Sequence, residues 1–364
     1  MTNHKDLYIG LMSGTSLDGI DAVLVSVEPA LEIIATHFSP FPTALREQLL
    51  ALCTPGDNEI ERMGNADRTL GECYAEACET LLSHANLPAK DVAAIGCHGQ
   101  TIRHRPGAQG FSIQIGSADV LAARTGIAVV NNFRNRDMVL GGQGAPLVPM
   151  FHARAFGREG ERRALINIGG MANVTLLQGQ TVTGGYDTGP GNVLMDSWYS
   201  KHHADNLDRN GDWAASGKVI GSLLATWLDD PYFHQPAPKS TGREHFNLCW
   251  LTQALAGDES AEDIQATLAE LTAETIAREV NAFGADSAYV CGGGVHNSDL
   301  MTRLRQHLSP ISCDSTDALG LSPDWVEACA FAWLAHARLH GIHGNATRVT
   351  GASKPAVLGA LYLP

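Results

Sequence analysis

The sequence opens on a stretch that points to its architecture, residues 7–27, which read LYIGLMSGTSLDGIDAVLVSV. Two segments of it, Leu7–Leu11 and Ala22–Val25, carry the β-branched and apolar residues typical of strands. The small polar residues Ser13–Gly19 separate these segments, and the pair Asp18-Gly19 is a strong hairpin-turn signal. The pattern therefore predicts two paired strands joined by a polar loop.

That loop contains the groups that a phosphate site needs. It presents backbone N–H groups, three hydroxyls and the Asp18 carboxylate within a few residues. Backbone N–H groups suit phosphate oxygens, and a nearby carboxylate suits Mg²⁺, directly or through water. An ordinary hairpin with a polar tip is the alternative, because short motifs often match by chance.

A second copy of the pattern lies near the middle of the chain. The segments Ala164–Ile168 and Val174–Leu177 flank the small and polar residues Gly169–Asn173. Two units of strand, glycine loop and strand suggest two similar domains that face each other. The phosphates of a nucleotide could then be gripped between the two loops.

Length and composition agree with two folded domains. The chain has 364 residues, of which 44% are hydrophobic and 18% are charged. These values are typical of a folded protein and leave room for two cores. We expect a first domain over residues 1–130 and a second over residues 131–345, with residues 346–364 packing back on the first.

The charge argues against polyanionic partners. With 25 basic and 39 acidic residues the net charge is −14, and no basic run stands out, which disfavours nucleic acid and anionic membranes. No segment reaches the roughly 18 apolar residues of a membrane span, and the start lacks the apolar core of a signal peptide. The eight cysteines show no CxxC spacing, as expected for reduced thiols. We therefore expect a cytoplasmic protein.

The other elements predict an α/β protein. Apolar residues recur at helical spacing in Glu59–Ala85 and Ile264–Phe283. Shorter helices are predicted at residues 117–124, 193–199 and 326–335, and further strands at residues 31–37, 92–97, 111–115, 127–131, 182–185 and 287–290. The proline-rich residues 229–246 indicate a long ordered loop or a mobile flap.

Polar residues follow one of the predicted strands, in the sequence His98–Thr101. Side chains just beyond the carboxyl end of a strand are where open α/β sheets bind ligands. His98 is therefore either a substrate contact or a hydrogen-bonded turn histidine. Farther along, Arg134 and Arg136 lie beside a glycine-rich loop. They are either contacts to an anion or sugar, or surface charges paired with Asp137.

Three later features also suggest a site. Asp187 stands in a predicted tight turn before Gly189-Pro190-Gly191, a sequence that excludes helix. The predicted strand at 287–290 runs into Gly292–Gly294, which lets the backbone approach a flat or charged ligand closely. Glu327 is the exception in an otherwise apolar helix, and such an acid is either paired or functional.

Together these stretches resemble the superfamily of sugar kinases, heat-shock ATPases and actin. Its features are paired glycine hairpins for phosphate, a lone Asp between them and a late glycine-rich strand. Within it, the chain is similar to the anhydro-N-acetylmuramic acid kinase family. The agreeing stretches, in order, are 10–19, 98–101, 141–149, 169–173, 187–192, 240–244, 292–294 and 350–352. Each is weak alone, but together in this order they are specific.

The resemblance implies two similar actin-like or ribonuclease H-like domains, each a mixed sheet with flanking helices, around a central ATP cleft. It implies a cytoplasmic, homodimeric enzyme of peptidoglycan recycling that uses ATP and Mg²⁺. Such an enzyme opens the 1,6-anhydro ring of anhydro-N-acetylmuramic acid with water and moves the γ-phosphate of ATP to O6. The product is N-acetylmuramic acid 6-phosphate. Phosphoryl transfer needs positioning and charge neutralisation more than covalent chemistry, so a glycine loop, a metal carboxylate and one base suffice.

The resemblance also implies roles for individual residues. The ATP phosphates would be lined by Ser13, Gly14, Thr15, Ser16, Leu17, Asp18, Gly19 and Ile20, with Asp18 near the metal, and by Gly169, Gly170 and Asn173. The adenosine would be approached by Gly292, Gly293 and Gly294. The sugar would be met by Glu327, His98, Gln100, Arg134 and Gly189. Asp187 would be the general base and would also contact the sugar, unless it only braces its turn through Thr188 and Asn192. Glu327 would be a second catalytic residue, which orients the attacking water or the sugar.

Other functions are consistent with the same residues. A kinase of an ordinary hexose or polyol would need no water-activating chemistry, and sequence patterns do not separate it. A nucleotide-dependent regulator or scaffold without turnover is a second alternative, although the short polar start leaves no room for a DNA-binding helix-turn-helix. A metal hydrolase is a third, but His98 and His104 stand six apart, farther than one helical turn. The motifs GxxxxGK[ST], HExxH and GxSxG are absent.

Overall fold

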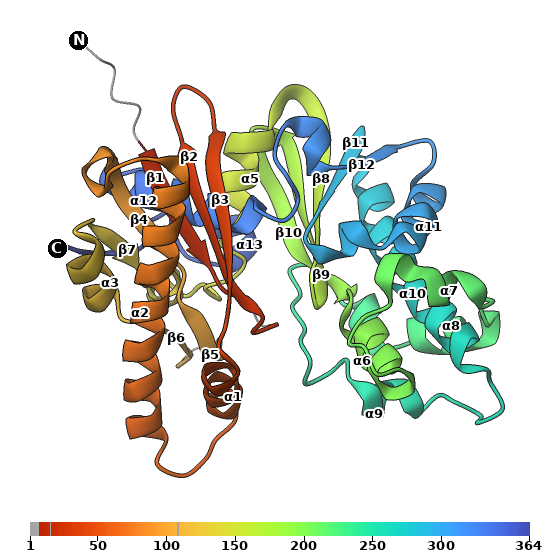
Figure 1. Cartoon of the computed structure of the whole chain (residues 1–364). Helices are drawn as coiled ribbons and strands as arrows, with labels where there is room; N and C mark the ends of the chain where they lie inside the picture. Colours follow the sequence, from red (N-terminus) through yellow and green to blue (C-terminus); the bar gives the residue numbers. More distant parts are fainter. Residues whose placement is uncertain (1–6, 15, 108) are drawn as a thin grey trace. The chain divides into compact units, whose positions relative to one another are not determined.

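The structure, a computed structural model, describes residues 7–14, 16–107 and 109–364 (Figure 1). Contacts within it divide the chain into two compact units. The first unit joins the described residues up to Ala155 to the segment Trp325–Pro364, and the second is the segment Phe156–Asp324. The second unit is therefore continuous in sequence, whereas the first is closed by the C-terminal segment.

A six-stranded mixed sheet forms the middle of the first unit. In spatial order its strands are β13 (Ala360–Tyr362), β7 (Val129–Asn131), β4 (Val92–Cys97), β1 (Leu7–Met12), β2 (Gly19–Ser26) and β3 (Glu32–Pro40). Strands β1, β2 and β3 are successively antiparallel, whereas β4 runs parallel to β1 and β7 runs parallel to β4. A separate hairpin consists of β5 (Gln100–Arg105) and β6 (Phe111–Ile115).

Helices cover this sheet. They are α1 (Thr43–Leu52), α2 (Glu59–Ala85), α3 (Ala118–Thr125), α4 (Phe133–Val139), α5 (Pro149–Phe156), α12 (Val326–Leu339) and α13 (Thr347–Thr350), with a 3-10 turn η1 (Ala89–Asp91). The long helix α2 packs on β2 and β3 (Figure 1). Its buried residues, among them Leu70, Tyr74 and Leu81, recur every three to four positions, as an amphipathic helix requires.

Two glycines let α12 lie directly on the central strands. Gly10 of β1 and Gly96 of β4 are opposite each other in the parallel register. A Cβ at Gly10 would overlap the carbonyl of Ala328, and one at Gly96 would overlap the carbonyl of Phe331. Helix α12 is buried nearly all round, which confirms the sequence prediction for residues 326–335. Glycine in the sheet thus fixes how closely the helix bearing Glu327 approaches it.

The second unit has a five-stranded mixed sheet with the same internal order. Its strands, in spatial order, are β10 (Thr181–Pro190), β9 (Met171–Gly179), β8 (Arg158–Ile168), β11 (Ser287–Cys291) and β12 (Ser312–Ser315). Strands β8, β9 and β10 are successively antiparallel, whereas β11 is parallel to β8 and β12 is parallel to β11. The first unit shows this pattern in β1, β2, β3, β4 and β7.

Helices and 3-10 turns complete the second unit. They are α6 (Val193–His202), η2 (Arg209–Gly211), α7 (Asp212–Ser216), α8 (Gly221–Leu228), η3 (Pro231–His234), α9 (Leu248–Thr252), α10 (Ala261–Phe283), η4 (Gly293–His296), α11 (Ser298–Leu308) and η5 (Thr316–Leu319). The core centres on α10, whose Leu268, Leu271 and Ile276 are buried among residues of all the surrounding elements. This unit therefore has a core of its own.

The predicted fold class is confirmed. Both units are α/β, each is a mixed sheet with flanking helices, and the two sheets repeat one strand order. The predicted helix at 59–85 is α2 with the same bounds. The eight cysteines, all within the described residues, form no disulfide. In the part of the chain that is described, no helix is long and apolar enough to cross a membrane.

Two predicted turns differ from the structure. Asp187 belongs to strand β10, at a bulge between Asp187 and Gly189, because pairing with β9 extends the strand to Pro190. At the first loop the left-handed backbone falls on Leu17, with φ of 56°, and Gly19 already begins β2. The side chain of Asp18 makes the reversal possible here by accepting hydrogen bonds locally.

The contact-defined units also have other bounds than the predicted domains. Residues 131–155 and 325–345 belong to the first unit, whereas the sequence assigned them to the second domain. The reason is packing, because α12 lies on β1 and β4. Strand β13 pairs with β7 at the edge of the same sheet. The C-terminal segment from Trp325 onward therefore belongs to the first unit and packs on its sheet.

Candidate active site

In the first unit, the loop after β1 is tied to the end of β4. The hydroxyl oxygen of Ser13 lies 2.6 Å from the Tyr74 hydroxyl, and Ser13 is buried. The side-chain amide of Gln100 donates to the carbonyl of Gly14 at 3.2 Å, and the N–H of His98 donates to the carbonyl of Leu11 at 3.0 Å. The carboxyl ends of two parallel strands thus bring these polar groups together.

The tip of this loop holds an exposed carboxylate. Oδ1 of Asp18 accepts hydrogen bonds from the Ser16 hydroxyl at 2.8 Å and from the Gly19 N–H at 3.0 Å. The side chain of Arg46 donates to the carbonyl of Leu17 at 3.0 Å, which fixes the loop to α1. Thr15, another predicted phosphate contact, lies outside the described residues. The Asp18 carboxylate is therefore oriented by its own loop.

Three charged or polar side chains of the first unit, His98, Arg134 and Glu327, lie near one another. Nη2 of Arg134 lies 2.7 Å from Nε2 of His98, and Nη1 of Arg134 donates to the carbonyl of Gly144 at 2.8 Å. Burial, and next the charge of Arg134, lower the pKa of His98 well below its usual range. Burial lowers the pKa of Arg134 to about 10, while the nearby Glu327 raises it. Burial raises the pKa of Glu327, and Arg134 lowers it. His98 is thus a neutral imidazole held by a cation.

Asp137 does not serve as the partner of Arg134. It is fully buried, and its carboxylate accepts from the Gly144 N–H, the Asn345 side-chain amide and the Thr350 hydroxyl at 2.7–2.8 Å. These bonds join α4 to the loop after it and to the C-terminal segment. Of the two sequence alternatives for Arg134, the surface charge paired with Asp137 is therefore wrong.

In the second unit, a row of polar side chains crosses three strands. The register pairs Asn167 of β8 with Asn173 of β9, and Asn173 with Asp187 of β10. The loop of Gly169 and Gly170 connects β8 to β9 at this edge, and the end of β10 packs tightly against it. The predicted residues of the second phosphate loop and Asp187 therefore share one end of the sheet.

The Asp187 carboxylate is held by the segment that follows η3. Its Oδ2 accepts from the Ser240 hydroxyl at 2.9 Å and from the Thr241 N–H at 3.0 Å. Burial raises the pKa of Asp187, and these two donors lower it, while the charge of Glu244 raises it. Its backbone carbonyl accepts from the Tyr232 hydroxyl at 2.7 Å. Neither Thr188 nor Asn192 donates to this carboxylate, so the sequence alternative that Asp187 only braces its turn through them is not supported.

The glycines after β11 lie at the same edge. Gly292 has a φ of 80°, which suits glycine, and a Cβ there would overlap the side-chain oxygen of Asn167. A Cβ at Gly294 would overlap Ile168 at the end of β8. The backbone of Gly292–Gly294 therefore packs directly on β8. Close approach to the neighbouring strand accounts for two of these three glycines.

Each unit thus assembles a share of the predicted residues. The first brings together the described residues Ser13, Gly14, His98, Gln100, Arg134 and Glu327. Residues 16–18 lie in the adjoining loop, and Gly19 and Ile20 begin β2. The second brings together Gly169, Gly170, Asn173, Asp187, Gly189 and Gly292–Gly294. Sequences far apart in the chain meet in each unit because parallel strands end at a common edge.

Sequence reasoning missed several supporting residues. Ser240 and Thr241 were part of a motif without a role, yet they hold Asp187. Arg243 of the same motif reaches to within 3.8 Å of the point where a Cβ on Gly170 would stand. The signal available was a polar run bearing one cation inside a proline-rich segment. Its contacts depend on the long connection before α9, which no local pattern specifies.

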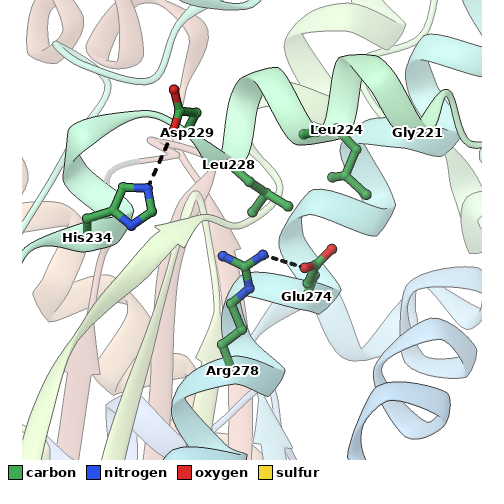
Figure 2. Close-up of a pocket in the computed structure, with 8 residues that line it drawn as sticks. Gly221, Leu224, Leu228, Asp229, His234, Glu274 and Arg278 are labelled. Carbon is green, nitrogen blue, oxygen red and sulfur yellow. Dashed lines mark hydrogen bonds and ion pairs between the residues drawn. The ribbon is translucent and has the colours of Figure 1, made fainter.

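A surface hollow of about 430 Å³ lies elsewhere in the second unit. Figure 2 shows it between α8, η3 and α10, with the ion pair of Glu274 and Arg278 at 2.6 Å along one wall. Asp229 and His234 form the other polar wall, with 4.0 Å between Oδ1 of Asp229 and Nε2 of His234. None of the described candidate residues lines this hollow. It is therefore distinct from the groups around Asp187.

The repeated strand order and the glycine loops at the strand ends define an actin-like protein of two α/β units. A model of the family "Anhydro-N-acetylmuramic acid kinase" matches residues 6–364. The chain belongs to that family.

Its relatives are similar over almost their whole length. The anhydro-N-acetylmuramic acid kinase of Pseudomonas fluorescens (strain Pf0-1) is 49% identical over 360 residues, which cover 98% of this chain and 99% of the relative. That of Nitrosomonas europaea is 48% identical over 359 residues, again 98% and 99% of the two chains. Among solved structures, an activator of the 2-hydroxyisocaproyl-CoA dehydratase from Clostridium difficile with bound ADPNP matches with a TM-score of 0.49 and 13% identity, over 92% of this chain and 96% of that one.

Proposed function

We propose that this chain is an ATP-dependent kinase that opens the 1,6-anhydro ring of anhydro-N-acetylmuramic acid and phosphorylates O6. The products are N-acetylmuramic acid 6-phosphate and ADP, and the reaction serves peptidoglycan recycling and amino-sugar catabolism. Family membership and the similarity of the relatives support the substrate and the reaction. The single observation that carries the chemistry is the Asp187 carboxylate, which two donors hold at the sheet edge shared with the glycine loops.

Asp187 acts as the general base. It takes a proton from water as that water attacks C1, the C1–O6 bond breaks, and O6 attacks the γ-phosphorus while ADP leaves. Because burial raises the pKa of Asp187, its carboxylate is a stronger base than an exposed one. No acid has to protonate O6, since O6 receives the phosphoryl group, and one carboxylate suffices where a glycosidase uses two.

Each unit contributes its own candidate contacts to the sugar. His98, Arg134 and Glu327 offer a neutral ring, a cation and a carboxyl group in one cluster, which suits a ligand with hydroxyl, amide and carboxylate groups. Gln100 adds an amide whose Oε1 is buried and has no partner among the described residues. Gly189, with a φ of 150°, lies beside Asp187 and packs against the ring of Phe233, and it is the remaining candidate contact.

The nucleotide is bound by the glycine-rich loops. The candidate phosphate contacts of the first unit are Ser13, Gly14, Ser16, Leu17, Asp18, Gly19 and Ile20, together with Thr15, which lies outside the described residues. Those of the second unit are Gly169, Gly170 and Asn173, and its candidate adenosine contacts are Gly292, Gly293 and Gly294. Bound Mg²⁺ would neutralise phosphate charge. No group of three potential metal ligands exists among the described residues. The exposed Asp18 carboxylate therefore fits a cation held largely by water and phosphate oxygens. Arg243 adds a cation near Gly170.

The remaining expectations concern setting and assembly. We expect a cytoplasmic homodimer that binds neither nucleic acid nor membrane, in keeping with the net charge of −14.

The first test of the proposed reaction measures ADP release with anhydro-N-acetylmuramic acid, with ordinary hexoses and polyols, and without sugar. ADP release that requires the anhydrosugar supports the proposal. Equal release with a hexose would favour the other sugar kinases, and no release with any sugar would favour a regulator.

A labelling experiment tests the role of water. In ¹⁸O-water the label should appear on the C1 hydroxyl of the product and not in the transferred phosphate. Label in phosphate would mean that ATP is simply hydrolysed, and the kinase mechanism would be wrong. Asp187→Asn should lose turnover by roughly 10²–10⁴-fold or more while still binding ATP and sugar in calorimetry. Asp258→Asn, an exposed acid of the same unit, is the matched control and should keep full activity.

A further inference from the structure

The segment between η3 and α9, residues 235–247 and called the flap below, is anchored beside Asp187 by a buried ion pair. Nζ of Lys239 lies 3.1 Å from Oε1 of Glu279 on α10, and the Lys239 side chain is only 3% exposed. The other carboxylate oxygen, Oε2, accepts from the Tyr186 hydroxyl at 2.8 Å. Glu279 therefore connects helix α10 to the flap and to strand β10 at once.

The backbone of Lys239 leads directly to the carboxylate of Asp187. The carbonyl of Lys239 accepts from the Asp187 N–H at 3.1 Å. The next two residues, Ser240 and Thr241, are the two donors to the Asp187 carboxylate. Because Ser240 and Thr241 follow Lys239 directly in the chain, fixing the backbone of Lys239 limits the positions that these two donors can take.

A third contact closes the network. The Lys239 ammonium stands 5.2 Å from the centre of the Tyr232 ring, within the range of a cation–π interaction. The Tyr232 hydroxyl in turn donates to the Asp187 carbonyl at 2.7 Å. Lys239 is thus joined to Asp187 by its backbone, by the two residues after it and through Tyr232.

Holding a segment in place with a buried ion pair costs free energy, because both charges lose contact with water. A buried ammonium with one carboxylate partner often stabilises a fold no more than apolar residues of the same volume would. What an ion pair adds over apolar packing is direction, because its atoms must meet at a hydrogen-bonding distance. The geometry therefore favours a role in positioning over a role in stability alone.

We propose that Glu279, through Lys239, is a positioning residue that holds Ser240 and Thr241 against the carboxylate of Asp187. This inference rests on the proposed function, in which Asp187 is the base. Glu279 itself contacts neither substrate nor reacting atoms. Its effect reaches the reaction through the two donors.

The arrangement has a consequence for the titration of the base. The charged and titratable groups around Asp187 are Tyr186 from β10, Tyr232 from η3, Lys239 and Glu244 from the flap, and Glu279 from α10. Burial and Glu244 raise the pKa of Asp187, and the Ser240 and Thr241 donors lower it. If the donors leave, its pKa rises further. Because the base works deprotonated, the acid limb of the pH profile then moves to higher pH.

The test compares two glutamates of the same helix. Glu279→Gln removes the charge that holds Lys239. Glu274→Gln is the matched control, since its side chain is equally 24% exposed but pairs with Arg278 on the wall of the hollow in Figure 2. We expect Glu279→Gln to move the acid limb of kcat/KM upward by about one pH unit, and thus to reduce activity about tenfold on that limb. Activity should return at alkaline pH, and Glu274→Gln should match the native profile.

Two further measurements make the outcome decisive. Ser240→Ala removes one donor at an exposed position without touching the ion pair, and it should shift the limb in the same direction. The pKa of Asp187 can also be read by NMR with ¹³C-labelled aspartate, assigned with Asp187→Asn, which needs no turnover. An unshifted Asp187 pKa in folded Glu279→Gln, or in Ser240→Ala, would overturn the proposal. Failure of the native protein to use the anhydrosugar would instead count against the proposed function.

Discussion

At the scale of single residues, the first unit depends on a guanidinium with two partners. Arg134 reaches His98 with Nη2 and the Gly144 carbonyl with Nη1, at 2.7 and 2.8 Å. A lysine has one compact ammonium on a flexible stem and cannot reproduce this planar fork. The cation would remain, but its direction would be lost. Geometry, and not charge alone, is therefore what Arg134 contributes.

We expect Arg134→Lys to raise KM for the anhydrosugar by about tenfold, the effect of losing one charge-assisted hydrogen bond. KM for ATP should change little. Steady-state kinetics with each substrate varied in turn measure both values. Arg136→Lys is the control, because Arg136 is exposed on the same helix and should leave both constants unchanged. Equal increases in both constants for Arg134→Lys would show a general structural effect.

A second residue-scale consequence is acid sensitivity. Burial lowers the pKa of His152 to about 3, and the side chain is 1% exposed. In the unfolded chain a histidine titrates near 6.5. Between these pH values the unfolded state binds a proton that the folded state does not, so stability falls as the pH is lowered below about 6.5.

The expected slope is about 1.4 kcal/mol per pH unit for this histidine. Urea unfolding at several pH values between about 6.5 and 4.5 measures that slope. His152→Gln should reduce the slope of the free energy of unfolding against pH by the contribution of one proton. This change in slope is expected whether or not the variant alters the stability at neutral pH. The raised pKa values of Asp187 and Glu327 act in the opposite direction and are common to both proteins. Parallel slopes in the two proteins would contradict a neutral His152.

At the scale of elements, the approach of α12 to the first sheet is set by glycine. A Cβ at Gly10 would overlap the carbonyl of Ala328, next to Glu327. Gly10→Ala should therefore displace the helix and lower the free energy of unfolding by roughly 3 kcal/mol, the upper end of typical overpacking. It should also weaken sugar binding, because Glu327 moves with α12. Chemical unfolding and calorimetric titration with the sugar measure the two effects.

The matched control is Gly64→Ala in the second turn of α2. Nothing lies within 4 Å of a Cβ added there. Alanine has less freedom to lose than glycine in a helix, so the variant should gain roughly 0.5–1 kcal/mol. A Gly10→Ala protein as stable as the native one would mean that α12 can retreat without loss.

Elements were predictable where one local signal dominates. Helix α2 was found with its bounds because apolar spacing runs unbroken from Glu59 to Ala85. Strand β5 was not found, because QTIRHR is polar and charged and pairs only with β6. Asp187 was assigned to a turn because glycine and proline follow it, yet pairing with β9 continues the strand. Tertiary pairing overrides local propensity in both cases.

The candidate site shows the same difference between features with a local sequence signal and features set by tertiary contacts. Asp187, Glu327 and the glycine loops are candidates because each is an unusual residue type in its sequence context, and their roles stay predictions. The residues that hold them could not be identified, since Lys239 meets Glu279 across 40 positions and Asp137 meets Thr350 across 213. A side chain that acts through distant packing leaves no local pattern.

At the scale of the whole molecule, the duplication was visible in the sequence but the path of the chain was not. Helix α12 is apolar all round, which predicts burial without saying against which sheet. It packs on β1 and β4, so the chain returns to the first unit at Trp325 and not near residue 345. The second unit is left as one continuous segment with its own core, between Ala164 and Cys313.

This division predicts how fragments behave. Residues 156–324, expressed alone, should fold, because the buried core of that unit lies entirely within them. Residues 131–345, the range expected from the sequence, should aggregate instead. That fragment carries α12 without β1 and β4, and so exposes a helix that is apolar on every face. Circular dichroism, cooperative urea unfolding and size-exclusion chromatography distinguish the two fragments. A monomeric and more stable 131–345 fragment would show that α12 belongs with the second unit, and an unfolded 156–324 fragment would show that its core is not sufficient.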